Sequence, residues 1–184
     1  VNWLSATILA LSIFYYAVIY TVWLKPRTPQ NIVIGGLFGA APPLFGWTAV
    51  TNQIEAGGVL LVLIIFVWTP PHFWALALER KDEYAKVDIP MLPIVHGDLI
   101  TKQYILSYTL ALLAISLVPW FIGMSTALYA VGAGLLGLGF LVSAVRLLLA
   151  KPNAAIQTFR FSIIYLMSLF FVLLLDHYFA ILAY

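Results

Sequence analysis

The sequence contains no cysteine, and only 9% of its 184 residues are charged. Without thiols the chain can form neither a disulfide framework nor a thiolate metal site, and its redox compartment cannot be inferred from them. Its nine Lys and Arg residues outnumber its seven Asp and Glu residues by only two, and basic residues this sparse do not predict a nucleic-acid partner. So few charges also exclude an ordinary soluble domain, in which about a quarter of the residues are charged.

Apolar residues dominate instead, at 64% of the chain with a mean hydropathy of +1.04. They form six stretches near the roughly 20 residues that a helix needs to cross a membrane. These stretches are residues 3–24, 31–50, 58–78, 103–121, 126–149 and 158–180. A backbone in lipid must satisfy its own hydrogen bonds, and the alternating pattern of a barrel is missing. The sequence therefore predicts an all-α, polytopic transmembrane helical bundle, with residues 1–184 as a single membrane domain.

All nine basic residues fall on one side of this predicted topology: Lys25, Arg27, Arg80, Lys81, Lys86, Lys102, Arg146, Lys151 and Arg160. By the positive-inside rule this side faces the cytoplasm. The chain begins at Val1 and not at methionine, so we expect residues upstream and infer nothing about a leader peptide.

Most of the chemistry lies in residues 69–98, which hold five of the seven acidic residues. Glu79, Asp82 and Glu83 are three and four residues apart, so they would share one face of a helix that continues past the membrane. Oxygen ligands in this arrangement outline a site for a hard cation. The neighbouring Arg80 and Lys81 could neutralise a multiply charged anion.

Two histidines lie in the same segment. His72 follows Pro70 and Pro71 within the third span, where an ionisable group is a functional candidate by default. The alternative is a neutral imidazole that bonds to a backbone carbonyl freed by the prolines. His96, which precedes Gly97 in a loop, is more typical of a turn residue.

Glycine and proline mark two other spans. Gly35 and Gly39 form a GxxxG pair, which more often indicates a close helix contact than a binding site. Pro42 and Pro43 interrupt the second span, and such interruptions are tolerated where the freed carbonyls face protein or a cavity. The fifth span carries a glycine-rich run, GAGLLGLGF, without the preceding strand of a dinucleotide site, so we expect close helix packing there.

The combination of carboxylates, basic residues and an apolar, aromatic interior fits a prenyl diphosphate as substrate. Carboxylates would hold Mg²⁺, and Lys or Arg would neutralise the leaving diphosphate. Aromatic faces from Trp68, Phe73 and Trp74 could stabilise an allylic cation. One element is missing, because residues 1–78 contain a single acidic residue, Glu55, on the opposite side.

Three stretches of this sequence look like a known family: YTVWLKPRTPQNIVIGGLFGAAPPLFGWTAV, WTPPHFWALALERKDEYAKVDIPMLPIVHG and FRFSIIYL. They resemble the UbiA-type intramembrane prenyltransferases, and among these the protohaem IX farnesyltransferase (haem O synthase) family. The resemblance implies the fold of that family, a bundle of nine transmembrane helices with two Asp-rich loops that bind Mg²⁺ and farnesyl diphosphate. This chain looks like the last six helices, the C-terminal two-thirds of a larger prenyltransferase, without the first Asp-rich loop.

The resemblance implies transfer of a farnesyl group from farnesyl diphosphate to a vinyl group of haem B, followed by addition of water, which gives haem O. Asp82, Glu83 and Lys25 become the candidate catalytic residues, and Glu79, Asp82 and Glu83 the Mg²⁺ ligands, although relatives carry Asp where this motif has Glu. Lys25, Arg27, Arg80 and Lys81 become the diphosphate-binding set, with His72 and His96 as candidate haem ligands. Because the first loop is missing, these 184 residues alone should not catalyse.

The expected location is a bacterial inner membrane with the site facing the cytoplasm, and a mitochondrial inner membrane stays open. Haem A synthase or the assembly of a terminal oxidase is a candidate partner, beside the lipid bilayer itself. Two alternatives remain: a UbiA-type enzyme that prenylates an aromatic or quinone-precursor acceptor, and a non-catalytic haem-binding or transport protein. The segments TPPHFW and PMLPIVHG argue against the aromatic acceptor, and the spans show no repeat symmetry typical of a transporter.

Overall fold

The computed structural model describes residues 2–86 and 90–182, and every regular element in that part of the chain is a helix. The elements are α1 (Trp3–Phe14), η1 (Tyr15–Leu24), α2 (Asn31–Gly39), α3 (Pro42–Thr51), α4 (Ala56–Glu79), α5 (Lys81–Ala85), α6 (Leu92–Val95), α7 (Gly97–Phe121), α8 (Ala127–Leu148) and α9 (Ala154–Leu182). Six stretches are long and apolar enough to cross a membrane: Trp3–Leu24, Asn31–Thr51, Ala56–Glu79, Gly97–Phe121, Ala127–Leu148 and Ala154–Phe179. The predicted all-α bundle with six spans is confirmed.

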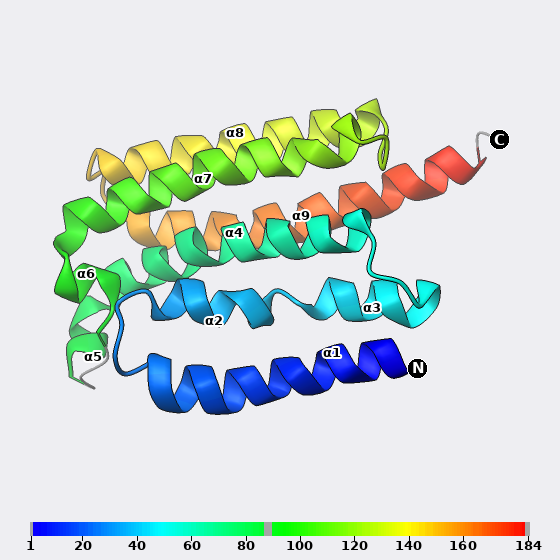
Figure 1. The fold of residues 1–184 in the computed structure, drawn as a ribbon. Coiled ribbons are helices and arrows are strands. Elements are labelled where there is room, and N and C mark those ends of the chain that lie inside the picture. Colours follow the sequence, from blue (N-terminus) through cyan, green and yellow to red (C-terminus); the bar gives the residue numbers. More distant parts are fainter. Residues whose placement is uncertain (1, 87–89, 183–184) are drawn as a thin grey trace.

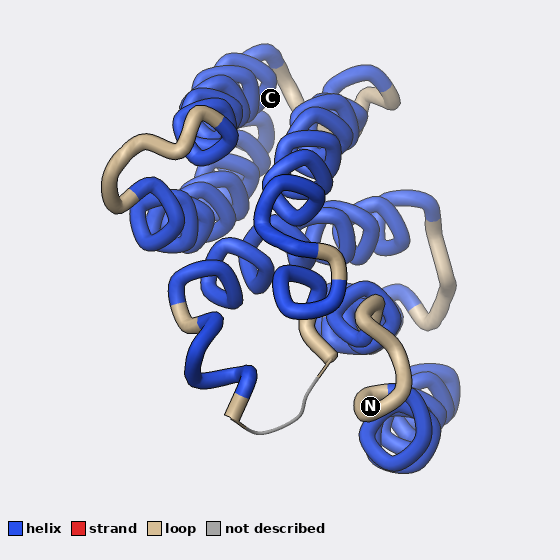
Figure 2. Tube along the Cα trace, turned by 90° about the vertical axis from the view of Figure 1, so that its left-hand side faces the viewer, coloured by secondary structure: helices blue, strands red, loops and turns tan. Residues whose placement is uncertain are grey.

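Four of these helices, α4, α7, α8 and α9, pack into one group, as the side and end views show (Figures 1 and 2). Helices α2 and α3 lie against α4, while α1 packs on α3 and η1 packs on α2 outside them. The centre of the four-helix group is closed by side chains that are fully buried, among them Tyr129, Phe140 and Tyr165. The helices outside this group, α1, η1, α2 and α3, are therefore the more open part of the molecule.

The connections divide between the two ends of the bundle (Figure 1). Residues 25–30 and 149–153, together with α5 and α6, lie at one end, whereas residues 52–55 and 122–126 lie at the other with both chain ends. Every Lys and Arg lies in the first set of connections or in the adjoining one or two turns of helix. This agrees with the predicted one-sided charge, and the orientation in a membrane stays a prediction.

The two proline pairs, Pro42–Pro43 and Pro70–Pro71, have different effects on the helices that contain them. Pro42 and Pro43 occupy the first turn of α3, and the second span is broken into α2 and α3 just before them. Proline suits this position because the first amides of a helix have no partner within it. Pro70 and Pro71, by contrast, lie inside α4, which continues from Ala56 to Glu79. The predicted interruption is confirmed for the second span.

The first span changes its helix type halfway. It begins as an α-helix and continues as a π-helix from Tyr15 to Leu24, in which each amide bonds to the carbonyl five residues earlier. The amide of Lys25 donates to the carbonyl oxygen of Tyr20 at 2.8 Å, which extends the pattern to the end of the span. Neither glycine nor proline occurs within Tyr15–Leu24, so no residue in the sequence predicted this change.

The glycine-rich fifth span packs closely on its neighbours, as expected. A Cβ on Gly132 would lie 2.9 Å from Val172 of α9, and one on Gly139 would lie 2.7 Å from Phe161.

The start of α8 is held by Asp176 of α9, which is 2% exposed. Its carboxylate accepts hydrogen bonds from the amides of Thr126 and Tyr129 at 2.8 and 3.1 Å, and from the Thr126 hydroxyl. Asp176 therefore caps α8 from a neighbouring helix.

Candidate functional site

A cavity of about 440 Å³ opens between η1, α2 and α4. Its lining is mostly apolar and aromatic, with a few polar groups, which is typical of small-molecule sites. The lining residues are Tyr16, Tyr20, Lys25, Asn31, Ile32, Gly35, Gly36, Gly39, Ile65, Trp68, Thr69, Phe73, Tyr84 and Met91. Most of them belong to η1, α2 and one face of α4, while Tyr84 comes from α5 and Met91 precedes α6. The predicted residues Lys25, Trp68 and Phe73 are among them.

The π-helix brings Lys25 to this cavity. Lys25 lies nine residues after Tyr16, about two and a half turns of an α-helix, which would put the two side chains on opposite faces. Hydrogen bonds to the fifth residue widen each turn, so residues four or five apart share a face. Tyr16, Tyr20 and Lys25 have this spacing, and all three line the cavity.

Glycines on α2 form the opposite wall. A Cβ on Gly35 would overlap the Tyr20 ring, with the Cε2 and Cε1 atoms at 2.7 and 2.8 Å. A Cβ on Gly36 would lie 3.1 Å from the Thr69 side chain, whereas one on Gly39 meets nothing within 4 Å. Gly35 thus makes a close contact, as the GxxxG pair predicted, while Gly39 leaves open space in the cavity.

Asn31 contributes an unusual group to this wall. It is 2% exposed, and its Oδ1 atom has no hydrogen-bond partner among the described residues. Its Nδ2 atom donates to the carbonyl oxygen of Lys25 at 3.4 Å and lies 3.9 Å from the sulfur of Met91. Buried polar atoms are almost always paired, so this buried, unpaired oxygen is an exception.

The three carboxylates do not share a helix face, so that prediction is wrong. Helix α4 ends at Glu79, Arg80 leaves helical geometry with φ −106° and ψ 30°, and α5 begins anew at Lys81. Glu79, Asp82 and Glu83 are all exposed. Within residues 2–86 and 90–182, no three His, Cys, Asp or Glu side chains are placed to hold a metal ion together.

Glu79 faces a second cavity of about 240 Å³, with Asp98, Lys102, Lys151 and Asn153 among its lining residues. Asp82 and Glu83 belong to neither lining, but Tyr84, which follows them on α5, lines the first cavity. The acidic motif is therefore divided, with Asp82 and Glu83 on the helix that borders the first cavity.

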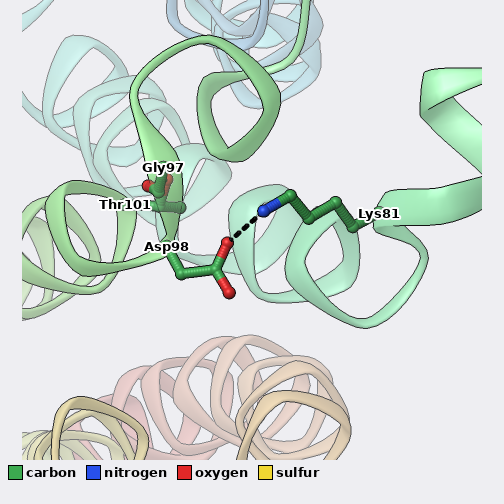
Figure 3. A network of polar contacts seen from close by, with 4 residues as sticks. All are labelled: Lys81, Gly97, Asp98 and Thr101. Carbon is green, nitrogen blue, oxygen red and sulfur yellow. Dashed lines mark hydrogen bonds and ion pairs between the residues drawn. The ribbon is translucent and has the colours of Figure 1, made fainter.

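The predicted diphosphate-binding residues are also divided. Lys25 lines the first cavity. Arg27 is exposed outside its lining, and Arg80 pairs with Glu83 at 3.7 Å. Lys81 points away to α7, where its ammonium lies 2.6 Å from the carboxylate of Asp98 (Figure 3). Of the four basic residues, Lys25 alone is part of the cavity wall.

His72 is 8% exposed and is held on three sides. Its ring stacks between Trp68 and Phe159, with centroids at 4.2 and 4.7 Å, and its Nδ1 atom lies 2.7 Å from the Ser162 hydroxyl. That hydroxyl has one hydrogen, which it donates to the carbonyl oxygen of Phe159 at 2.6 Å. Nδ1–H must therefore donate to Ser162, and Nε2 keeps a free lone pair. His72 bonds a side chain, so the alternative of a bond to a carbonyl freed by the prolines is wrong.

The remaining predicted residues lie apart from the cavity. His96 is exposed at the start of α7. Trp74 is fully buried and packs edge to face on Tyr104 and Tyr108, so it does not line the cavity as Trp68 and Phe73 do. The expectation that all three aromatic residues face one ligand is wrong for Trp74.

Sequence reasoning missed several cavity residues, chiefly Tyr16, Tyr20, Asn31 and Thr69. Asn31 had a usable signal, because a polar residue opens an apolar span and Gly35 and Gly39 follow it at intervals of four on the same helix face. The tyrosines had none, since their alignment with Lys25 depends on the π-helix.

The described chain is thus an all-helical bundle of membrane-spanning length with an apolar, aromatic cavity and a lysine in the cavity wall. The sequence profile of the UbiA prenyltransferase family matches residues 1–180. The chain belongs to this family.

Proteins named protoheme IX farnesyltransferase are similar to this chain over nearly all of its length. The protein of Teredinibacter turnerae is 59% identical over 179 residues, which are 97% of this chain and 58% of that protein. That of Marinobacter nauticus is 60% identical over 97% of this chain and 59% of its own length. Protoheme IX farnesyltransferase 1 of Pseudomonas putida is 61% identical, over 96% and 60%. The chain spans about three fifths of these relatives, and no solved structure matches it.

The contact between Gly35 and Tyr20 can be tested by Gly35→Ala. The added methyl overlaps the Tyr20 ring, so Tyr20 must shift, and we expect the free energy of unfolding to fall by about 1–3 kcal/mol. Gly39→Ala is the matched control, because its methyl meets nothing within 4 Å on the same helix face. Thermal unfolding in detergent measures both, and equal stability of the two variants would contradict the contact.

Proposed function

We propose that the protein containing this chain transfers the farnesyl group of farnesyl diphosphate to a vinyl group of haem B, which gives haem O. The observation that carries this is the cavity between η1, α2 and α4, whose lining combines apolar and aromatic residues with Lys25. The names of the relatives, at about 60% identity over 97% of the chain, support the same reaction.

The chemistry follows from the two ends of the cavity. Lys25 neutralises negative charge that develops on the diphosphate as the bond to the farnesyl carbon breaks. Trp68 and Phe73 present aromatic rings to the allylic cation and exclude bulk water. The vinyl π electrons of haem then form the new carbon–carbon bond, and the positive charge moves to the vinyl carbon next to the porphyrin ring. Water adds to that carbon, and its extra proton passes to the departed diphosphate, which leaves the hydroxyl group of haem O.

Mg²⁺ is the proposed cofactor. Its sites usually combine one or two carboxylates with phosphate oxygens of the substrate and do not need a cage of protein ligands. Asp82 and Glu83, adjacent acidic residues on the helix that borders the cavity, fit this requirement, whereas Glu79 faces the second cavity. Mg²⁺ held there would neutralise charge on the leaving diphosphate.

His72 is the proposed ligand or orienting group for the haem iron. Metal-binding histidines usually donate their second ring N–H to a fixed partner, and Ser162 is such a partner. Access to Nε2 would require the rings around it to move. A His72→Ala variant that binds haem with unchanged affinity and absorption spectrum would remove this role, and His96, exposed at the start of α7, is the weaker candidate.

The proposed setting is a bacterial inner membrane, with the end that carries α5 and α6 toward the cytoplasm, in keeping with the lysines and arginines gathered there. A mitochondrial inner membrane would meet the same physical requirements. Haem A synthase or a terminal-oxidase assembly is proposed as the partner that receives the product.

Replacing Lys25 tests the proposed function. The full-length protein with haem B, farnesyl diphosphate and Mg²⁺ should form haem O, identified by mass spectrometry. Lys25→Met should raise the KM for farnesyl diphosphate about tenfold or more, because one charge-assisted contact is lost. Arg27→Met is the control outside the cavity lining and should change the KM little.

Two outcomes would contradict the proposal. Prenylation of an aromatic acid without any farnesylated haem would assign the alternative acceptor. Equal effects of the Lys25 and Arg27 substitutions would mean that the cavity does not hold the diphosphate.

The metal proposal predicts that Asp82→Asn raises the Mg²⁺ concentration needed for half-maximal turnover at least about tenfold. The loss of a hard, charged oxygen ligand is the reason. Glu79→Gln should leave this concentration unchanged, because Glu79 lines the second cavity. A titration with Mg²⁺ measures both variants, and a shift confined to Glu79→Gln would reverse the assignment.

A further inference from the structure

The end of the first cavity that lies away from Lys25 has no role in the proposed function. Contacts between the helices show how the cavity runs from Lys25 to this end. The Nδ2 atom of Asn31 donates to the carbonyl oxygen of Lys25 at 3.4 Å, so the first residue of α2 lies level with the end of η1. Both residues line the cavity beside the connection 25–30 (Figure 1). The polar end of the cavity therefore lies at the end of the bundle that carries the basic residues.

Further in, α2 has close contacts on two sides. A Cβ on Gly35 would lie 2.7 and 2.8 Å from the Cε2 and Cε1 atoms of Tyr20 on η1. A Cβ on Gly36 would lie 3.1 Å from the side chain of Thr69 on α4. All four residues line the cavity. These contacts fix the alignment of the three helices at a second level.

Tyr16, Gly39 and Ile65 form a third level of the lining. Each lies four residues beyond a residue of the second level on its own helix, which is about one turn. The rings of Tyr15 and Phe38, with centroids 4.2 Å apart, show that η1 still lies against α2 here. Among the described residues, the lining includes none from α1, from α3 or from α4 before Ile65. The cavity therefore ends at this level, about 12 Å along α2 from its first residue.

Gly39 leaves open space at this far end. A Cβ on Gly35 points at Tyr20 of η1, and one on Gly36 points at Thr69 of α4. Gly39 lies four residues after Gly35 and three after Gly36, so its own Cβ position faces between η1 and α4. A Cβ placed there meets nothing within 4 Å. The space beside Gly39 thus belongs to the cavity that η1, α2 and α4 enclose.

We propose that Gly39 sets the length of the isoprenoid chain that the protein accepts, an inference that rests on the proposed function. With the diphosphate at Lys25, the apolar chain runs along α2, and its last isoprene unit lies between Tyr16, Gly39 and Ile65. The absence of a side chain at Gly39 leaves room for that unit. A larger residue there would fill the space and favour a shorter chain.

Gly39→Leu tests this inference, because a leucine side chain is nearly the size of one isoprene unit and would take its place. The full-length variant receives haem B, Mg²⁺ and equal amounts of farnesyl diphosphate and of geranyl diphosphate, which is shorter by one isoprene unit. Mass spectrometry measures the ratio of geranylated to farnesylated haem, which reports the ratio of the two kcat/KM values. This ratio should rise at least about tenfold over the wild type, since even one methylene in an apolar pocket changes kcat/KM by about tenfold or more.

Gly46→Leu on α3 is the matched control. A Cβ on Gly46 also meets nothing within 4 Å, but Gly46 is not part of the cavity lining. This variant should keep the wild-type ratio. It separates the filling of the cavity from a general effect of leucine at an open glycine position.

Ile65→Ala tests the same level from the opposite wall. The substitution removes apolar volume at the far end, so the use of geranylgeranyl diphosphate, which is longer than farnesyl diphosphate by one isoprene unit, should rise about tenfold relative to farnesyl diphosphate. Leu63→Ala is the control, because Leu63 is an exposed residue of the same helix outside the cavity lining. It should leave the preference unchanged.

An unchanged ratio in Gly39→Leu would overturn the inference and leave the proposed function intact, as would an equal rise in Gly46→Leu. If Gly39→Leu transfers neither chain, the Ile65→Ala measurement decides, and unchanged use of the longer donor then overturns the inference. Absence of farnesylated haem from the wild-type protein would instead contradict the proposed function.

Discussion

Every backbone amide and carbonyl within a bilayer must find its partner inside the protein, and the structure depends on this constraint. Regular helices meet it by themselves, which is why the described chain is helical from Trp3 to Leu182 apart from short connections. Two interruptions occur within the predicted spans: the π-helix Tyr15–Leu24 and the break between α2 and α3. Both adjoin the same cavity, through Tyr16 and Tyr20 on one side and Gly39 on the other. Within the described spans, these two departures from the regular α-helix thus lie beside one cavity.

These two interruptions explain how polar residues come to line one end of the cavity in an otherwise apolar bundle. The wider turns of η1 carry Lys25 to the face of Tyr16 and Tyr20, and α2 begins with Asn31 at the same level. On α4, Trp68 faces the cavity, while its indole nitrogen donates to the carbonyl oxygen of Ser162 at 2.8 Å. The hydroxyl of Ser162 holds His72 on the neighbouring face. One residue of α9 therefore positions both an aromatic wall of the cavity and the histidine behind it.

The spans and the one-sided charge could be predicted because each depends on composition over about 20 residues, which the membrane itself dictates. The sequence also singled out Lys25, Trp68 and Phe73 as candidate site residues, and all three line the cavity. The prediction that Glu79, Asp82 and Glu83 share a helix face was wrong. The helix breaks at Arg80, where no proline or glycine indicates a break. Tyr20 and Asn31 were missed for a related reason. Their roles arise from contacts between helices, namely the Tyr20 ring on Gly35 and the Asn31 amide on Lys25, which no local pattern encodes.

The central claim is that the cavity beside Lys25 and Asn31 receives the isoprenoid diphosphate. Photocrosslinking with a light-activated analogue of farnesyl diphosphate, followed by peptide mass spectrometry, tests it most directly. The account predicts labels on η1, on α2 and on the Trp68–Phe73 segment of α4, with unlabelled farnesyl diphosphate competing for all of them. Labels restricted to the second cavity around Lys102 and Lys151, or to the outer faces of α7 and α8, would contradict it.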